Sequence, residues 1–410
     1  MKAKADSGPN SDVAPQQPLL SPCVVLGQIQ WRGPLRTPET ASRLTTRSRR
    51  GHPTAGGAAS VSTATYERGI PDDDGTGLHL RDDPSGRMQP KRGRPRSWLV
   101  PALLGSAAAL GAAALYTLKQ TRAAERRHPP IGRFLDVDGV RLHYIERGRG
   151  DPLVLIHGNG TMIQDFTVCG LVERLAERYR VIVIDRPGYG YSSRPRQLWS
   201  PRAHARLFRN ALVQLGVGQA LVYGHSWGTL AAVALALEAP WLVRGLVLGS
   251  GYYYPTLRAD TFLLSPPAIP VIGDAMRYTV SPLVARAVLP GMIKRVFQPA
   301  PVPERFEREF PKALMLRPLQ LRAAAEDAAL MTPSVMELER RYGDLKMPVT
   351  IIAGTDDQIS DVGRQSARLH RELPHSEFIT LPGLGHMIHH LDVDAVAAAI
   401  THTDRRSNPG

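Results

Sequence analysis

The sequence of 410 residues predicts an α/β fold with a mostly parallel sheet and helices on both of its faces. From about residue 131 onward, short apolar runs alternate with longer segments of helical character. Most of the later runs are apolar at every position, which is typical of strands buried on both faces of a parallel sheet. The predicted strands are 134–137, 140–145, 153–156, 181–184, 220–222, 245–248, 349–352 and 377–381, and the predicted helices are 168–178, 200–215, 228–239, 362–372 and 392–402.

The first 90 residues differ in composition from the rest of the chain. They are rich in Pro, Gly, Ser, Thr and Arg, and such a segment buries too little apolar surface to offset the entropy of ordering it. We therefore expect residues 1–90 to be disordered. Several arginines between positions 43 and 50 leave a nucleic-acid-binding arm as the alternative. Because the cluster has no interleaved aromatic residues and acidic residues follow it, we expect no nucleic-acid partner.

Residues 98–118 form the longest uncharged apolar stretch of the chain, with basic residues on both sides. A helix of this length, rising 1.5 Å per residue, spans the hydrocarbon core of a bilayer, which is about 30 Å thick. Residues 91–119 are thus predicted to be a basic flank and a single-pass membrane anchor near the N-terminus. A buried core helix and a cleaved signal peptide are the alternatives. The two flanks carry equal numbers of Lys and Arg, so the positive-inside rule does not decide on which side of the membrane the rest of the chain lies.

Met88 opens a short basic segment that leads directly into this apolar stretch. A basic segment followed by an apolar one is the usual layout at the start of a targeted chain. A natural start at Met88 is therefore an alternative to the start at Met1. Residues 1–87 would then be an upstream extension without function, which their composition suits.

Ser226 lies in a G-x-S-x-G pentapeptide between a predicted strand and a predicted helix. The sharp turn between such elements needs glycines at its flanking positions, and it presents the serine hydroxyl above the sheet edge. A serine becomes a nucleophile when a histidine takes its proton and a carboxylate holds that histidine in one tautomer. The sequence context therefore makes Ser226 the candidate nucleophile rather than a serine in an ordinary turn.

Candidates for the other two groups follow in the chain order Ser, Asp, His. Asp356 and Asp357 come directly after the strand 349–352, and we favour Asp357 from its position in the turn. His386 lies in a glycine-rich loop after the last predicted strand, whereas His389 and His390 fall on the helical stretch beyond it. These positions predict a catalytic triad of Ser226, Asp357 and His386.

The tetrahedral intermediate of acyl transfer needs two N–H donors for its oxyanion. The residue after the nucleophile, Trp227, supplies one backbone N–H. The turn after the strand 153–156 should supply the other, and Asn159 is the expected donor there. The alternative is that Gly158 and Gly160 merely form a loop.

Five stretches together resemble the α/β-hydrolase fold family: 155–160, 185–192, 224–228, 354–357 and 385–386. The resemblance implies an eight-stranded sheet whose second strand is antiparallel, a core of residues 131–251 and 345–405, and a helical cap at 252–344. Within the family, the pair Asn159 and Trp227 is similar to the halide-binding pair of haloalkane dehalogenases, which, like epoxide hydrolases, use an aspartate nucleophile. Here Ser226 occupies that position, so the resemblance implies acyl transfer to water by a serine hydrolase.

The residues and the resemblance together predict a hydrolase that cleaves a carboxylic ester through an acyl-enzyme, on a small, apolar substrate beneath the cap. Amides, thioesters and C–C bonds are other possible targets, and perhydrolysis or acyl transfer would use the same triad. A catalytically silent binding or scaffold protein is the alternative of a different class. Two cysteines far apart exclude a disulfide framework, and we expect no metal and no cofactor because no phosphate-binding or dinucleotide motif is present.

Overall fold

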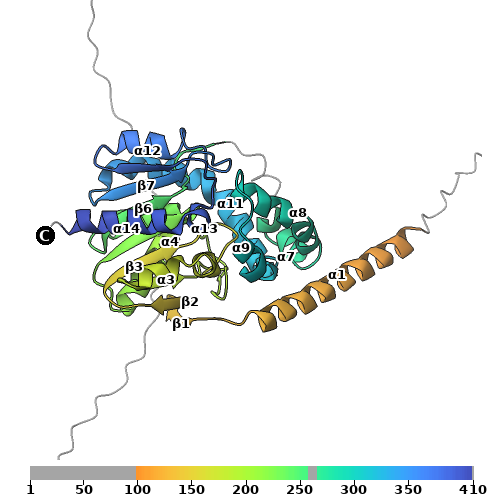
Figure 1. Cartoon of the computed structure of the whole chain (residues 1–410). Coiled ribbons are helices and arrows are strands. Elements are labelled where there is room, and N and C mark those ends of the chain that lie inside the picture. The colour runs from red at the N-terminus through yellow and green to blue at the C-terminus, as the bar shows by residue number, and fades with distance from the viewer. Residues whose placement is uncertain (1–97, 257–265, 409–410) are drawn as a thin grey trace, which may run out of the picture. The chain divides into compact units, whose positions relative to one another are not determined.

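The computed structural model describes residues 98–256 and 266–408. The predictions for residues 1–90, the alternative start at Met88 and the basic flank at 91–97 all lie outside the described residues. Eight strands form one sheet in the order β1-β2-β4-β3-β5-β6-β7-β8 (Figure 1). Their bounds are β1 Arg133–Val137, β2 Val140–Arg147, β3 Asp151–Ile156, β4 Tyr179–Ile184, β5 Ala220–His225, β6 Val243–Gly249, β7 Val349–Gly354 and β8 Glu377–Leu381.

Only β2 runs against its neighbours. It pairs antiparallel with β1 across the turn at Asp138 and Gly139 and antiparallel with β4, while every other neighbouring pair is parallel. The central strands β3, β4 and β5 are buried almost throughout, as their unbroken apolar sequences predict. The predicted mostly parallel eight-stranded α/β sheet is thus confirmed.

Helices cover both faces of this sheet (Figure 1). On one face α4, α5 and α12 join the larger apolar core, and on the other α3 and α14 join a second core. α5 is buried on nearly every side, which is why it is apolar all around. These helices and their small neighbours are α2 Gln164–Val168, α3 Leu171–Ala176, α4 Pro201–Gln214, α5 Gly228–Glu238, α12 Ser366–Glu372, α13 Ile388–Leu391 and α14 Val393–Ser407.

Two predicted helices differ from the observed ones. The predicted helix 168–178 is observed as the shorter α3, which begins at Leu171 because Gly170 before it takes a left-handed conformation with φ of 88°. Only the first predicted residue, Val168, belongs to another helix, α2. The predicted helix 362–372 begins only at Ser366. The first difference follows from a single glycine, whose left-handed conformation a hydrophobic pattern does not reveal.

The regular elements that the structure describes between β6 and β7 are all helical, and they fall in the range predicted as a cap. Its longest helices are α8 and α11, and α11 packs against α5 of the core. The elements are η1 Pro266–Ala268, α7 Ile272–Met276, α8 Val280–Phe297, α9 Glu304–Glu309, α10 Lys312–Met315, α11 Pro318–Leu338 and η2 Glu339–Asp344.

Helix α1, Leu99–Arg127, contains the predicted anchor but continues nine residues beyond its end at Leu118. The extension consists of residues that favour helices, and it ends where Pro129 and Pro130 follow. Within the described residues α1 alone is long and apolar enough to cross a membrane by length and composition, and its most apolar part is not buried.

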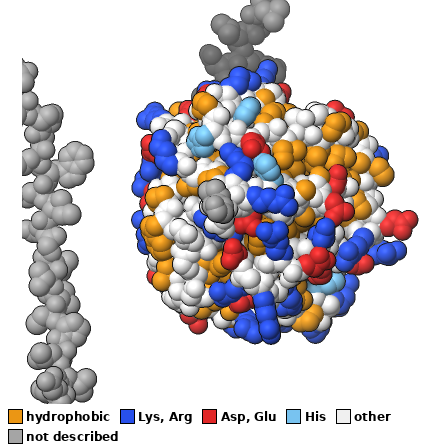
Figure 2. Space-filling view, turned by 60° about the vertical axis from the view of Figure 1, so that its left-hand side comes forward, with side chains coloured by type: hydrophobic (Ala, Val, Ile, Leu, Met, Phe, Trp, Pro, Cys, Tyr) orange, Lys and Arg blue, Asp and Glu red, His pale blue; other side chains and the backbone are white. Residues whose placement is uncertain are grey.

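The C-terminal end of α1 contacts the rest of the domain. Ala124 is buried in a small apolar core with residues of α8 to α10, and Glu125 forms an ion pair with Arg317 at 3.1 Å. Elsewhere the surface is mixed in charge, and the face in Figure 2 shows basic and acidic side chains interspersed.

Candidate active site

Ser226 occupies the turn between β5 and α5, with a backbone φ of 54° that is uncommon for a residue with a side chain. The flanking glycines are required by close packing. A Cβ atom on Gly228 would lie 2.3 Å from the carbonyl oxygen of Ile156, and one on Gly224 would lie 2.7 Å from the carbonyl oxygen of Gly228. The pentapeptide therefore brings the start of α5 directly against the end of β3, as its pattern predicts.

The three predicted triad residues lie within hydrogen-bond distance of one another. His386 Nε2 is 2.8 Å from Ser226 Oγ, and His386 Nδ1 is 2.8 Å from Asp357 Oδ2. His386 is 4 % exposed and Asp357 is 9 % exposed, whereas Ser226 is half-buried. Three segments far apart in the sequence thus place a hydroxyl, an imidazole and a carboxylate in a line.

Asp357 rather than Asp356 makes the contact with His386. The second oxygen of Asp357, Oδ1, accepts hydrogen bonds from the backbone N–H groups of Ile359 at 2.8 Å and Ser360 at 2.9 Å. Asp356 is exposed, and its side chain accepts only from Thr355. The two backbone donors fix the carboxylate so that one oxygen faces the imidazole.

The loop after β3 lies against the serine turn. A Cβ atom on Gly158 would approach the Cβ atom of Ser226 to 3.1 Å. Within the described residues the backbone N–H groups of Asn159 and Trp227 donate no hydrogen bond. The side chain of Asn159 is held from two sides, because its Oδ1 accepts from the Tyr189 hydroxyl at 2.6 Å and its Nδ2 donates to Ala324 at 3.2 Å.

A buried charge network that sequence reasoning missed lies beneath this loop. Asp327 of α11 pairs with Arg186 at 2.5 Å and with Arg194 at 2.9 Å, and all three side chains are fully buried. Burial alone would raise the pKa of Asp327, but the guanidinium groups of Arg194 and Arg186 bring it below its usual value. The Tyr189 hydroxyl also donates to Asp327 at 2.9 Å. We call Arg186, Arg194 and Asp327 the arginine network.

Arg186 connects this network to the peptide group between Gly158 and Asn159. Its Nη2 donates to the Gly158 carbonyl at 2.9 Å, and its backbone N–H donates to His157 Nε2 at 3.0 Å. His157 Nδ1 then carries the proton and donates to the same Gly158 carbonyl at 2.9 Å. Burial, followed by the charge of Arg186, lowers the pKa of His157 to about 4, which keeps the ring neutral in this role.

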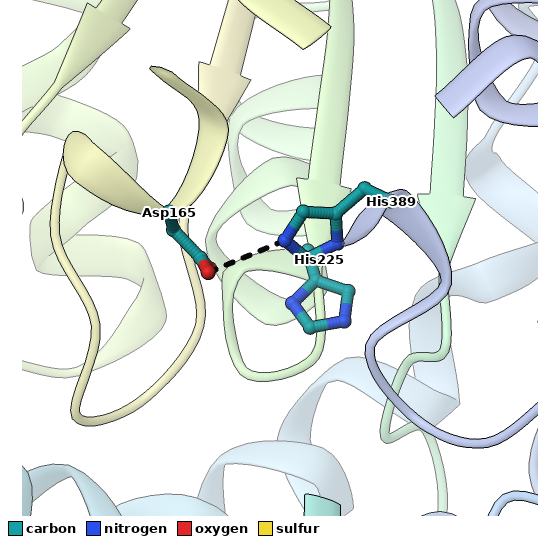
Figure 3. Close-up of side chains that lie close together, drawn as sticks. All are labelled: Asp165, His225 and His389. Carbon is teal, nitrogen blue, oxygen red and sulfur yellow. Dashed lines mark ion pairs between the residues drawn. The ribbon is translucent and has the colours of Figure 1, made fainter. Parts of the chain in front are cut away.

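A second buried group lies behind the triad and consists of Asp165, His225 and His389 (Figure 3). His389 Nε2 is 3.3 Å from Asp165 Oδ1, and His225 Nε2 is 3.0 Å from the carbonyl oxygen of His386. Burial lowers the pKa of both histidines. One ligand atom from each residue lies within 4.8 Å of the others, so these three residues could hold a divalent cation. Because positions 165, 225 and 389 form no spacing motif, sequence reasoning could not have found this group.

A cavity of about 780 Å³ lies among α8, α9, α10 and the loop that joins α8 to α9. Its lining does not include Ser226, Asp357 or His386. We therefore do not assign this cavity to the bond that the triad would attack.

Comparison with known proteins gives relatives and solved structures that cover most of the described chain. Haloalkane dehalogenase 2 of Mycobacterium tuberculosis is 28 % identical over 287 residues, which are 67 % of this chain and 94 % of that protein. The crystal structure of a membrane phospholipase A superposes with a TM-score of 0.52 at 23 % identity, covering 76 % of this chain and 97 % of the other. An esterase of Thermogutta terrifontis superposes with a TM-score of 0.52 at 21 % identity, covering 67 % of this chain and 99 % of the esterase.

At these identities the two solved structures establish a likeness of fold alone. The model of the alpha/beta hydrolase fold family matches residues 151–393, which run from β3 to the first residue of α14 and contain every residue of the candidate triad. Taken with the strand order and the strand–serine–helix turn, this match shows that the chain belongs to the alpha/beta hydrolase fold family.

Proposed function

We propose that this protein is a serine hydrolase that cleaves a carboxylic ester through an acyl-enzyme. The observation that carries the proposal is the unbroken line of hydrogen-bond contacts from Ser226 through His386 to Asp357. Its relatives include hydrolytic enzymes, which supports a hydrolase in general. The ester and the acyl-enzyme are our inference from a serine at the nucleophile position.

In the first half-reaction His386 Nε2 takes the proton of Ser226 Oγ while this oxygen attacks the carbonyl carbon of the ester. His386 then gives that proton to the alkoxide that leaves, and the acyl group remains on Ser226. In the second half-reaction His386 takes a proton from water while the water oxygen attacks the acyl carbon. The bond between that carbon and Ser226 Oγ then breaks, His386 returns its proton to Oγ, and the acid leaves. Asp357 holds the imidazole with Nδ1 protonated, so that Nε2 is free to act as the base.

Two backbone N–H groups, of Asn159 and Trp227, would bind the oxyanion in both half-reactions. The Gly158 carbonyl belongs to the same peptide group as the Asn159 N–H and accepts hydrogen bonds from both Arg186 and His157. Hydrogen bonding at a carbonyl polarises its peptide and strengthens the N–H as a donor. We assign Arg186 a positioning role in this oxyanion site.

Residues 252–344 would form a helical cap over the site. Contacts from this segment to the loops support that role, because Asn159 Nδ2 donates to Ala324 and Gln320 Nε2 donates to the Gly160 carbonyl at 3.0 Å. A cap of this kind would select an apolar substrate and exclude water.

A panel of p-nitrophenyl esters of increasing chain length, assayed with the full chain, tests the proposal. We expect hydrolysis by the wild type and a loss of at least about a thousandfold in Ser226→Ala, because the nucleophile is removed while the fold is kept. Ser193→Ala is the matched control, since Ser193 lies in the neighbouring loop and its hydroxyl contacts only the backbone of Arg141.

A fluorophosphonate probe separates this proposal from that of a silent scaffold. The wild type should be labelled at Ser226, and Ser226→Ala should not. Hydrolysis by Ser226→Ala within tenfold of the wild type would refute the triad. Absence of both labelling and hydrolysis in the wild type would favour a binding protein.

We also propose that α1 anchors the protein in a membrane, because it is long and because its most apolar part is not buried. The full chain should sediment with membranes and resist carbonate extraction. A chain shortened to begin at Lys119 keeps the contacts of Ala124 and Glu125. It should remain in solution and hydrolyse a soluble ester within about threefold of the full chain. Carbonate-soluble full chain would refute the anchor.

A further inference from the structure

Helix α8 exposes a band of apolar side chains to solvent. Val280, Val284, Val288 and Met292 follow one another at intervals of four residues, and Leu283 lies beside them. Val284 is 51 % exposed and Met292 is 44 % exposed. Residues four apart lie on the same side of a helix, so these side chains form one continuous surface. Such a surface normally marks a binding site, because soluble proteins rarely leave large apolar patches uncovered.

The charge of α8 is of one sign. No Asp or Glu occurs between Asp274 and Glu304, whereas Arg286, Lys294 and Arg295 all lie on the helix and are exposed. Within the part of the chain that the structure describes, none of these three cations forms an ion pair. The face shown in Figure 2 differs, because its basic side chains are interspersed with acidic ones. An apolar band with unpaired cations and no anions is complementary to a bilayer that contains anionic lipid.

The contact between α8 and α1 fixes the depth at which this band would lie. A small cleft where α1 meets α8 is lined by four residues of α1, three of α8 and two at α10: Tyr116, Thr117, Gln120, Thr121, Pro282, Leu283, Arg286, Ala313 and Leu316. The uncharged stretch of α1 ends at Leu118. If that stretch crosses the hydrocarbon core, then Leu283 and Arg286 lie at the boundary between acyl chains and headgroups. An amphipathic helix at the surface of a bilayer lies at this same boundary.

We propose that α8 is a second membrane contact, which docks its apolar band on the bilayer that α1 enters. Arg286, Lys294 and Arg295 would bind the phosphate groups of anionic phospholipids. The cavity of about 780 Å³ is lined by two of these cations, Arg286 and Lys294, and by apolar side chains such as Leu289 and Ile293. Its lining also contains Glu307, whose charge is balanced by an ion pair with Lys312. This lining suits one acyl chain of such a lipid. The proposal rests on the anchor proposed above and does not depend on the hydrolase activity.

Depth-dependent quenching in vesicles tests the contact directly. The full chain, with Cys23→Ser and Cys169→Ala, receives a single cysteine by Val288→Cys or by Val213→Cys. Val213 of α4 is a matched control, because it is also an exposed valine on a helix but joins no apolar band. Each variant is labelled with an environment-sensitive dye and reconstituted in phosphatidylcholine vesicles with phosphatidylglycerol. A nitroxide-bearing lipid serves as the quencher.

We expect the nitroxide to quench the dye at position 288 at least about threefold more than at position 213, since only the former would lie among lipids. Changing Arg286, Lys294 and Arg295 to Gln, or omitting phosphatidylglycerol, should lower the quenching at 288. Equal quenching at 288 and 213 would overturn the proposal, and so would a full chain that does not associate with the vesicles. If the unlabelled Val288→Cys variant formed a disulfide between two chains and the labelled variant showed no quenching, the proposal would also be overturned, because a second copy would then cover α8. No part of this experiment measures hydrolysis, so a negative result for the α8 contact would leave the proposed hydrolase function unaffected.

Discussion

The candidate triad and the arginine network are both buried polar assemblies, but they connect different parts of the molecule. Ser226, His386 and Asp357 follow strands β5, β8 and β7 of one sheet, so all three come from the core. Arg186 and Arg194 come from the chain after β4, whereas Asp327 comes from α11 in the helical segment. The first assembly is therefore internal to the sheet, and the second joins the sheet to the segment above it.

This difference separates the residues that would react with the substrate from the residues that would hold the surrounding loops in position. The triad contains the groups that would exchange protons and form bonds with the substrate. The arginine network contacts the Gly158 carbonyl and anchors α11, so it would act through the oxyanion loop and the cap. Substitutions in the triad should therefore reduce activity and leave stability nearly unchanged. Substitutions in the network should reduce both.

The largest effect on activity is expected from the base. His386→Ala should lower kcat by on the order of 10⁵-fold with little change in the free energy of unfolding, because proton transfer is lost. His402→Ala is the matched control, since His402 is an exposed histidine that pairs with Glu377. Steady-state kinetics and urea unfolding of both variants provide the measurements. A large loss of stability in His386→Ala alone would remove the contrast between the two assemblies.

The carboxylate should have the next largest effect. Asp357→Asn keeps the shape of the side chain but supports the wrong tautomer of His386, and it should lower kcat by about 10⁴-fold. Asp356→Asn changes an exposed neighbour and should stay within about threefold of the wild type. The kcat values of the two variants give the ranking. The opposite ranking would show that Asp356 is the partner in solution.

Asp327→Asn tests the arginine network. Arg186 and Arg194 would both lose the charge of Asp327, although Arg194 would keep its ion pair with Glu326. We expect the free energy of unfolding to fall by about 3–5 kcal/mol. The neighbouring Glu326→Gln should cost no more than about 1 kcal/mol, because Glu326 is partly exposed and both its arginines have solvent or other partners. Urea unfolding measures the free energy of unfolding, and a change in kcat shows whether the oxyanion loop is still held in position. A stable Asp327→Asn protein with unchanged kcat would show that the network positions nothing.

The smallest effect concerns pH. His204 packs against Trp227 and Trp199, and burial, with a further contribution from Arg186 and Arg194, lowers its pKa from 6.5 to about 3. Between these two values the unfolded chain binds a proton that the folded chain does not, so stability falls as the pH falls below 6.5. His204 should account for about 2 kcal/mol of the loss between pH 7 and pH 5. Urea unfolding of His204→Phe at both pH values should show a correspondingly smaller loss. An unchanged loss would mean that His204 is already charged in the folded protein.

Local sequence determined the strands, the serine turn and the order of the triad. Gly224 and Gly228 could be recognised as necessary because a sharp turn between a strand and a helix admits no Cβ atom at those positions. The carboxyl ends of parallel strands lie at the same edge of a sheet. Residues just after β5, β7 and β8 were therefore expected to lie close together. For the same reason the sequence indicated Ser226, Asp357 and His386 without any knowledge of packing.

Tertiary structure alone decided which charged groups are buried and with whom. Nothing in the local sequence distinguishes Asp327 from its neighbour Glu326 in an alanine-rich helical stretch, because its role depends on two arginines more than 130 residues away. The group of Asp165, His225 and His389 became visible only when three separate elements met behind the triad. The exposed band of α8 is likewise a property of packing, since an apolar helix sequence looks the same whether its surface is covered or open. Backbone geometry is encoded by neighbouring residues, whereas burial depends on the whole fold, and for this reason the sequence predicted the candidate triad but not its supporting contacts.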